Sequence, residues 1–451
     1  MELWLTICDF LKPSDRKSLA LTCRTLFRLL NAKASFLVLK LNAEGFRNFA
    51  QLYRHSRTLL FANEVHWQGS KRHYRRRRSA NPLTLAGHAS RFIFSMLSTS
   101  TALRSLRLFR VEVSPSHQKV IVSVPTLRDL TLQESLFIPT NERMPHTSIT
   151  SLSFKQCFCV EAPMSHILSL FAGSLETITL DTALLFTHPF METIRLPRLT
   201  HLRHTGIQWR ASNMAKLSFQ STITTLFLGP ATTHQIGDIP PGVLPQLREL
   251  WAPCPVGKQL IPGRPVTCFY DTSLKKVGTG EIDETLSYFA QSTIGITQLE
   301  MCTELTVPSL FATLETRLPH IKRFRLLTES DRFRHNPNFA TLHKNEAGTG
   351  AAALKEVEIR FRAWAGCHDP PFISTDNCRT IFEALERACS ALEAVTFTVV
   401  GEREKLEKDE SVLPPQSMYK LCKTGAGTWE ERWGACTRSG GNPHTCSPRR
   451  L

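Results

Sequence analysis

The residue groupings that could perform catalysis or bind a metal ion are few, and each lies in an unfavourable context. The glycines of GTGAAA, starting at Gly348, have the spacing of a dinucleotide-binding loop, but the segment leads into a strand-like pattern where that motif requires a helix. Cys157 and Cys159 are too close together to act as a paired zinc clip. Four further residues could surround zinc only at spacings that match no zinc module: Cys422, Cys436, His444 and Cys446. The sequence therefore predicts a protein that is not an enzyme and has no cofactor and no metal site.

One pattern of apolar residues recurs along most of the chain. Three apolar anchors, separated by two residues and then by one, occur in copies that start at Leu103, Leu127, Ile149, Leu175, Leu199, Ile223, Leu247, Leu274, Ile296, Ile321, Leu354 and Leu392. The starts from 103 to 296 are 22 to 27 residues apart, and apolar helical segments precede several copies. A period near 24 with this pattern predicts an irregular leucine-rich-repeat solenoid, because each turn buries its anchors against the next turn. A β-sandwich or an ordinary α/β domain is the alternative.

The position between the last two anchors points outward from each strand, on the concave face of such a solenoid. In the twelve copies this outward position holds Arg107, Thr131, Ser153, Thr179, Arg203, Phe227, Trp251, Gly278, Glu300, Arg325, Glu358 and Thr396. Arg203, Phe227 and Trp251 stand on consecutive repeats, and arginine and large aromatic residues dominate binding hot spots. These three are the candidate target-binding residues. The alternative is that loops or the C-terminal tail cover them.

Two short helical patterns precede the repeats. The apolar positions of the first are spaced as one helical face: Leu3, Ile7, Phe10 and Leu11. Pro13 then ends the first helix, and Ser14 or Asp15 can cap a second one. The second helix continues with Leu19, Cys23, Leu26 and Leu30. Two such short helices cannot bury their apolar faces alone, so they must pack on the rest of the chain or on another protein.

This segment resembles an F-box, and its most specific part is Pro13-x-Asp15 followed by the block Leu21 to Arg24. The resemblance implies binding to the Skp-family adaptor of a cullin–RING ubiquitin ligase through Leu3, Ile7, Phe10, Leu11, Pro13, Leu19 and Leu26. Two departures weaken it: the usual Leu-Pro lead is absent before Glu2, which suggests a start truncated in the F-box, and Arg16 replaces the leucine after the aspartate. A plain helical cap on the following domain is the alternative.

The chain is strongly basic, with 55 lysines and arginines against 39 aspartates and glutamates. Such a surplus favours acidic partners, including protein surfaces and nucleic acid. The densest basic patch consists of Lys71, Arg72, Arg75, Arg76, Arg77 and Arg78. A solvated insertion, a nuclear import signal or a contact with an acidic partner would each explain it. Tyr74 is the only aromatic residue within it, so nucleic-acid binding is disfavoured. Lys322, Arg323 and Arg325 form a second basic group, interpreted as a solvated face.

These patterns divide the chain into four parts and place it in the α/β class. Residues 1–32 form the F-box, residues 33–100 form transition or capping repeats that carry the basic loop 71–78, and residues 101–400 form the solenoid. Residues 401–451 contain a charge run and a segment without periodicity, so a disordered tail is expected.

Other features of the composition favour an intracellular protein. No apolar run is long enough to cross a membrane, and the N-terminus lacks the pattern of a secretory signal. The 13 cysteines are scattered, and several, including Cys302 and Cys389, lie inside apolar patterns, where free thiols behave as small apolar groups. A reducing compartment, cytoplasmic or nuclear, is therefore expected.

The resemblance and the repeats together predict a substrate-recognition subunit of an SCF-type ubiquitin ligase. In this interpretation the F-box binds the Skp-family adaptor and its cullin complex, and the repeat face holds an unidentified protein substrate. A leucine-rich-repeat interaction scaffold with a degenerate F-box is the first alternative. A basic repeat protein that binds nucleic acid is the second and ranks below it.

Overall fold

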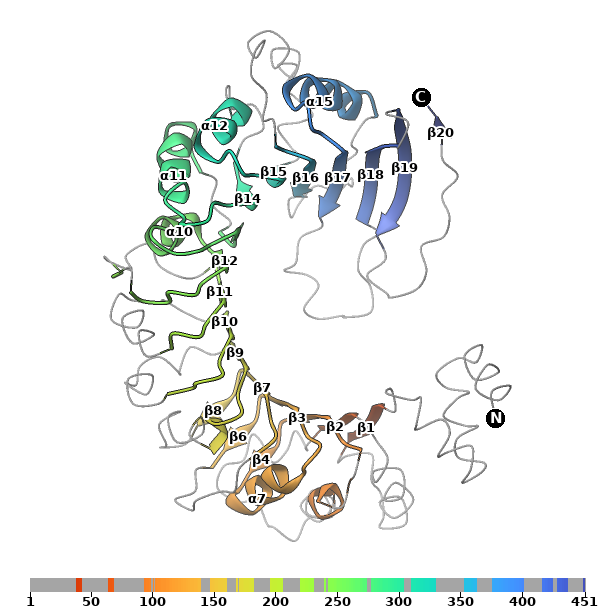
Figure 1. The fold of residues 1–451 in the computed structure, drawn as a ribbon. Coiled ribbons are helices and arrows are strands. Elements are labelled where there is room, and N and C mark those ends of the chain that lie inside the picture. The colour runs from red at the N-terminus through yellow and green to blue at the C-terminus, as the bar shows by residue number, and fades with distance from the viewer. Residues whose placement is uncertain are drawn as a thin grey trace. The chain divides into compact units, whose positions relative to one another are not determined.

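The computed structural model describes parts of the chain that fall into two compact units, Met1–Ile207 with Phe219–Thr222, and Gln208–Ser218 with Ile223–Leu451 (Figure 1). The described residues are 38–42, 64–68, 93–98, 100, 102–138, 147–159, 168, 170–181, 195–205, 220–230, 239–240, 242–273, 277–303, 310–329, 353–362, 375–400, 416–424, 428–436 and 449–450.

The first unit is built on a parallel sheet with one strand per repeat. Its strands, in the order in which they pair, are β1 (Val38–Asn42), β2 (Glu64–Gln68), β3 (Ser105–Phe109), β5 (Asp129–Gln133), β7 (Ser151–Lys155), β9 (Thr177–Asp181) and β10 (His201–His204). Equivalent anchors, such as Leu106, Leu130 and Leu152, are in register and buried. His204 stands at the third anchor position of the copy that starts at Leu199, and it is 1% exposed, so this position faces inward although its residue is polar. The repeat period therefore gives a stack of strands with a continuous core.

A second, short ladder follows the strand ends in the first unit. Strands β4 (Glu112–Val113), β6 (Leu136–Phe137) and β8 (Phe158–Cys159) pair in parallel, and helix α7 (Pro115–Ser123) follows β4.

Between the two ladders the chain turns through Arg110, Glu134 and Gln156, whose φ angles are 55°, 46° and 50°. A left-handed residue other than glycine costs about 1–2 kcal/mol. The backbone N–H of each of these three residues donates a hydrogen bond to a carbonyl oxygen of the next strand, at 2.8–3.0 Å. This hydrogen bond offsets the cost of the left-handed conformation.

The residue directly after this left-handed turn residue links neighbouring repeats through its side chain in two repeats. Ser135 Oγ accepts a hydrogen bond from the Val111 N–H at 3.1 Å and donates to the Leu108 carbonyl at 3.2 Å. Cys157 Sγ donates to the Leu132 carbonyl at 3.1 Å. The leucine-rich-repeat pattern has asparagine or cysteine at this position, three residues past the last anchor, and Cys157 supplies it in the copy that starts at Ile149. Ser135 performs the same task because a hydroxyl can both donate and accept.

The second unit is also a parallel sheet. Its strands, in pairing order, are β11 (Thr225–Leu228), β12 (Glu249–Ala252), β13 (Cys268–Asp271), β14 (Gln298–Cys302), β15 (Arg323–Glu329), β16 (Glu356–Arg362) and β17 (Ala394–Val400). Anchors such as Leu250, Phe269, Leu299 and Phe324 are in register and almost fully buried. Cys302 and Cys389 are buried, as the apolar pattern predicted.

Helices accompany the later strands of this unit. They are α10 (Cys254–Leu260), the 3-10 turn η5 (Thr279–Glu281), α11 (Ile282–Phe289), α12 (Leu310–Arg317) and α15 (Thr375–Ala388), and α10, α11 and α12 lie together on one side of the strands (Figure 1). A Cβ at Gly257 of α10 would lie 2.7 Å from the ring of Phe269, so glycine allows the helix to approach β13 closely. Phe269 in turn packs on Phe289 of α11, with ring centroids 4.6 Å apart. Each strand-plus-helix repeat thus shares one core, which is the leucine-rich-repeat type of arrangement.

One predicted repeat copy is wrong. The pattern placed a strand in the copy that starts at Leu274, with Gly278 in the outward position. The strand of this repeat is β13, which lies earlier, and Val277 forms only an isolated bridge with Thr303. The repeat that contains β13 starts at Val266, and the true outward residue is Tyr270.

The pattern misplaced this repeat because its third anchor is a charged residue, Asp271. This residue is nevertheless buried, with 8% of its surface exposed. Its Oδ1 accepts hydrogen bonds from the backbone N–H groups of Cys254 (3.2 Å) and Ser273 (2.9 Å), and its Oδ2 accepts one from Cys302 (3.3 Å). Burial raises the pKa of Asp271, and the hydrogen bonds oppose that shift. A carboxylate can replace an apolar anchor here because three backbone N–H groups donate hydrogen bonds to its two oxygens. These bonds compensate for the solvation that the carboxylate loses on burial.

The expectation of a disordered tail over residues 401–451 is wrong in part. Strand β18 (Gln416–Lys423) pairs antiparallel with β17, β19 (Trp429–Cys436) pairs with β18, and the short β20 (Arg449–Arg450) pairs with β19. Leu421 is fully buried, and Trp429 donates from Nε1 to Glu386 Oε1 of α15 at 2.6 Å. The charge run earlier in the tail led to the expectation of disorder. The short alternating segment that follows it is strand β18, which covers the edge of β17.

A buried arginine holds the loops around α10. Arg264 is 1% exposed and its guanidinium donates only to carbonyl oxygens, those of Pro240, Val243, Gln259, Leu260 and Pro262, at distances from 2.7 to 3.4 Å. Burial lowers its pKa. The planar fork of arginine suits this task because it offers five N–H donors in fixed directions.

Candidate functional site

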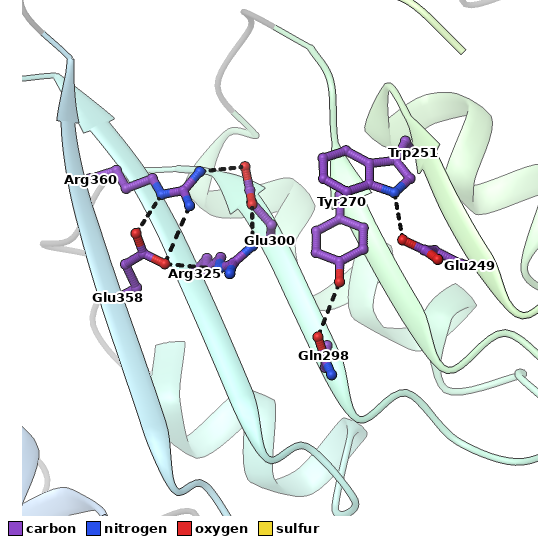
Figure 2. Close-up of polar contacts among 8 residues, drawn as sticks. All are labelled: Glu249, Trp251, Tyr270, Gln298, Glu300, Arg325, Glu358 and Arg360. Carbon is purple, nitrogen blue, oxygen red and sulfur yellow. Dashed lines mark hydrogen bonds and ion pairs between the residues drawn. The ribbon is translucent and has the colours of Figure 1, made fainter. Parts of the chain in front are cut away.

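The outward face of the second sheet carries a continuous row of large side chains. The parallel register aligns Phe227, Trp251, Tyr270, Glu300, Arg325, Glu358 and Thr396, one from each strand from β11 to β17. Parallel strands are about 4.8 Å apart, so neighbouring side chains in such a row are forced into contact. The row is half-buried throughout, and it divides into an aromatic part and a charged part (Figure 2).

The aromatic part is a stack of three rings. Trp251 and Tyr270 lie face to face, with ring centroids 4.0 Å apart and planes 19° apart, and Phe227 lies 5.9 Å from Trp251. The polar atoms of both larger rings are held by side chains on the outward face, one on the same strand and one on the next strand. Trp251 Nε1 donates to Glu249 Oε1 at 2.8 Å, and the Tyr270 hydroxyl donates to Gln298 Oε1 at 3.1 Å. Contacts within the protein therefore hold Trp251 and Tyr270 in position without a bound partner.

The environment of Tyr270 also affects its ionisation. Burial is the main cause that raises its pKa, with contributions from Cys268 and Glu249, and Arg325 opposes the rise; the pKa is about 12. Tyr270 therefore stays neutral and keeps its hydroxyl proton for Gln298.

The charged part is a closed network of two glutamates and two arginines. Arg325 Nε lies 2.9 Å from Glu358 Oε2, and Arg360 Nε lies 2.7 Å from Glu358 Oε1. Both arginines also approach Glu300, at 3.6 and 3.7 Å. Figure 2 shows the four side chains as a ring of alternating charge beside Tyr270. Lys322 and Arg323 are exposed, as a solvated face requires, but the carboxylates of the neighbouring strands pair with Arg325, so its charge is not free.

Glu300 is the most enclosed member of this network. Its side chain is 12% exposed, and burial raises its pKa even though Arg360 and Arg325 lower it. The charge of Glu300 therefore depends on its two arginine neighbours, since a lone carboxylate at this depth would lose more solvation than it gains.

The first unit presents a different outward face. Its row consists of His66, Arg107, Thr131, Ser153, Thr179 and Arg203. Arg107 Nε lies 2.9 Å from Glu64 Oε1, and Arg203 is exposed. The central positions are small hydroxyl residues, so this face has no aromatic stack comparable with that of the second unit.

The binding role of the three predicted target-binding residues stays a prediction, and the structure shows where each of them lies. Phe227 and Trp251 are neighbours in the second unit, whereas Arg203 belongs to the first unit. Sequence reasoning missed Tyr270, Glu249 and the pairing of Arg325 with glutamates. The signal for Tyr270 was present in VTCFYD, but its charged third anchor concealed it.

Other predicted sites lie outside the described residues. They are the adaptor-binding residues Leu3, Ile7, Phe10, Leu11, Pro13, Leu19 and Leu26, and the basic patch Lys71, Arg72, Arg75, Arg76, Arg77 and Arg78. Within the described ranges, no group of three or more histidine, cysteine, aspartate or glutamate residues is arranged to hold a metal ion. No helix in the described part of the chain has both the length and the apolar character that a membrane crossing needs.

The register and the buried anchors define the class of the protein: a repeat protein of the leucine-rich-repeat type. No protein-family model matches the chain, and no curated protein matches it significantly. Among solved structures, it is similar to the crystal structure of an internalin from Listeria monocytogenes, with 12% sequence identity and a TM-score of 0.29 over 70% of this chain and 87% of that chain. The assignment to this class rests on the strand register and anchor burial described above.

Proposed function

We propose that the protein is a non-catalytic protein-interaction scaffold that binds a target on the outward strand face of its second unit. The observation that carries the proposal is the row of Phe227, Trp251 and Tyr270, half-exposed on three consecutive strands. Aromatic residues at the centre of a surface supply most of the energy in protein interfaces.

The rigidity of this face supports the proposal. Trp251 and Tyr270 are stacked and hydrogen-bonded, and they project from a parallel sheet whose anchors are buried. A partner that contacts them would immobilise few additional side chains, so less of the contact energy would be lost as conformational entropy.

The finer proposal is that the scaffold is the substrate-recognition subunit of an SCF-type ubiquitin ligase. It is supported by the F-box resemblance of residues 1–32, with Pro13, Asp15 and the block Leu21 to Arg24. In that role the N-terminal segment binds the Skp-family adaptor and the second unit holds the target. Holding the target near the ubiquitin-loaded enzyme raises its effective concentration, and the scaffold itself performs no chemistry.

Two sets of variants test the two levels of the proposal separately. Affinity purification of the full chain should recover a Skp-family adaptor, and Leu11→Ala with Ile7→Ala should abolish that recovery. Trp251→Ala with Tyr270→Ala should leave the adaptor bound and lose one or more other proteins, which the control variant Ser153→Ala on the first unit retains. If neither the wild-type chain nor any variant recovers the adaptor, the ligase role is rejected. The proposal of an interaction scaffold would then stand without a link to a ubiquitin ligase. If the same proteins bind whether or not Trp251 and Tyr270 are present, the second unit's face is not the binding surface.

A further inference from the structure

We infer that the partner segment places a lysine or arginine side chain against Glu249, with the aliphatic part of that side chain along the rings of Trp251 and Tyr270. This rests on the proposed function, because it specifies the chemistry of a ligand for the same face. It runs against the simple expectation from the basic composition of the chain, which favours an acidic partner.

The first argument is a balance of charge across the outward face of the second sheet. Three of its arginines, among the described side chains, are matched to glutamates on a neighbouring strand or on their own strand. Arg323 pairs with Glu356 at 2.9 Å, and Arg325 and Arg360 both pair with Glu358. These cations are engaged, so the face offers an acidic partner little free positive charge.

Glu249 differs from Glu300, Glu356 and Glu358, which are all ion-paired. Within the described residues its carboxylate has no ion pair, and its hydrogen bond comes from the neutral Trp251 Nε1. Its neighbours in the strand register, Thr225 and Cys268, carry no positive charge either. Glu249 is thus a carboxylate beside an aromatic stack with one oxygen, Oε2, still available to a cation.

The stack explains how such a cation would be held. Trp251 and Tyr270 cover one face of each other, Phe227 lies on the far side of Trp251, and the Arg325 guanidinium lies 5.9 Å from the centre of the Tyr270 ring. The ring faces are therefore occupied, and the ring edges remain for a partner. Lysine and arginine bind such surfaces by laying their methylene groups on apolar edges while the charged end reaches a carboxylate.

Selection of peptides by the intact protein tests this chemistry without a known partner. A phage-displayed library of random peptides is panned on the immobilised full-length chain, on Trp251→Ala, on Glu249→Gln and on Glu249→Lys. Glu383→Lys, an exposed position on α15, is the control for added positive charge. Circular dichroism of each variant establishes that the strands are retained.

The wild-type chain and the Glu383→Lys control should enrich peptides with lysine or arginine beside an apolar residue, and Trp251→Ala should lose them. For a synthetic peptide from this set, Glu249→Gln should weaken binding about three- to tenfold, because the ring contacts remain while the ion pair is lost. Glu249→Lys should select aspartate or glutamate at the same position.

The outcomes separate the inference from the function on which it depends. Peptides that require Trp251 but show no preference for a cation, or that select acidic residues on the wild type, would overturn the inference and leave the binding face intact. If no enriched peptide depends on Trp251, then the proposed function itself fails.

Discussion

Replacement of Arg264 by methionine should strongly destabilise the second unit. The side chain is buried, and its two shortest hydrogen bonds, to the carbonyls of Val243 and Pro240, are both 2.7 Å long. Hydrogen bonds from a charged donor contribute about 1.5–3 kcal/mol each, so these two contribute about 3–6 kcal/mol. Methionine has a similar length but no donor, and it leaves the carbonyls without their partners in a region that excludes water.

The cost of burying the guanidinium reduces this estimate. Burial lowers the pKa of Arg264, which shows that the folded environment disfavours the charged form. Methionine removes that unfavourable contribution, so the expected loss is about 3 kcal/mol, near the lower end of the range. A loss of this size is a large fraction of the 5–15 kcal/mol that stabilises an ordinary domain.

Urea unfolding followed by tryptophan fluorescence measures the effect, because Trp251 reports on the second unit. Arg264→Lys is the informative companion variant. Lysine keeps the charge but concentrates its donors on one nitrogen, so it cannot reach the Pro240 and Val243 carbonyls together with that of Leu260. It should lose nearly as much stability as methionine. A transition midpoint unchanged in Arg264→Met would refute the reasoning, and full stability in Arg264→Lys would show that charge alone is required.

Three further changes test other parts of the structure. Ser135→Ala should destabilise the first unit by about 1–3 kcal/mol, because the buried N–H of Val111 loses its acceptor, and Ser135→Cys should recover part of the loss in thermal unfolding. Glu300→Gln should gain stability relative to the wild type as pH rises from about 4 to 7. Burial raises the pKa of Glu300, so the folded wild type holds its proton more tightly than the unfolded chain and loses stability over that window; a relative gain on acidification in urea titrations would contradict this. Leu421→Asp should detach β18 and expose the edge of β17, which hydrogen exchange at the amides of β17 would detect, whereas unchanged protection would show that β18 does not cover that edge.

The period of the apolar anchors was sufficient to predict the class of the fold. Anchors at regular spacing, such as Leu106, Leu130 and Leu152, must face one interior, because each repeat can bury its apolar residues only against the next. The same pattern correctly placed His204 inside, and it placed Phe227 and Trp251 in adjacent outward positions. These features depend on local spacing, and the sequence carries that directly.

The composition of the proposed binding face depended on contacts that spacing does not encode. Tyr270 joined the stack only because Asp271 could replace an apolar anchor, and that substitution requires backbone donors from Cys254 and Cys302, which lie far from it in the sequence. Arg325 changed from a free cation to a neutralised one because the neighbouring strands bring Glu300 and Glu358 beside it.

The same distinction applies to the ends of the second sheet. Strand β18 formed in a segment whose charge run predicted disorder, because the edge of β17 offered unpaired backbone groups and a place to bury Leu421. The sequence by itself determined the repeat, its anchors and the outward positions, since these follow from local periodicity. Only the tertiary structure decided which outward residues meet, which charges cancel and which carboxylate of the described face keeps no ion pair, because those properties arise between strands that are distant in the chain.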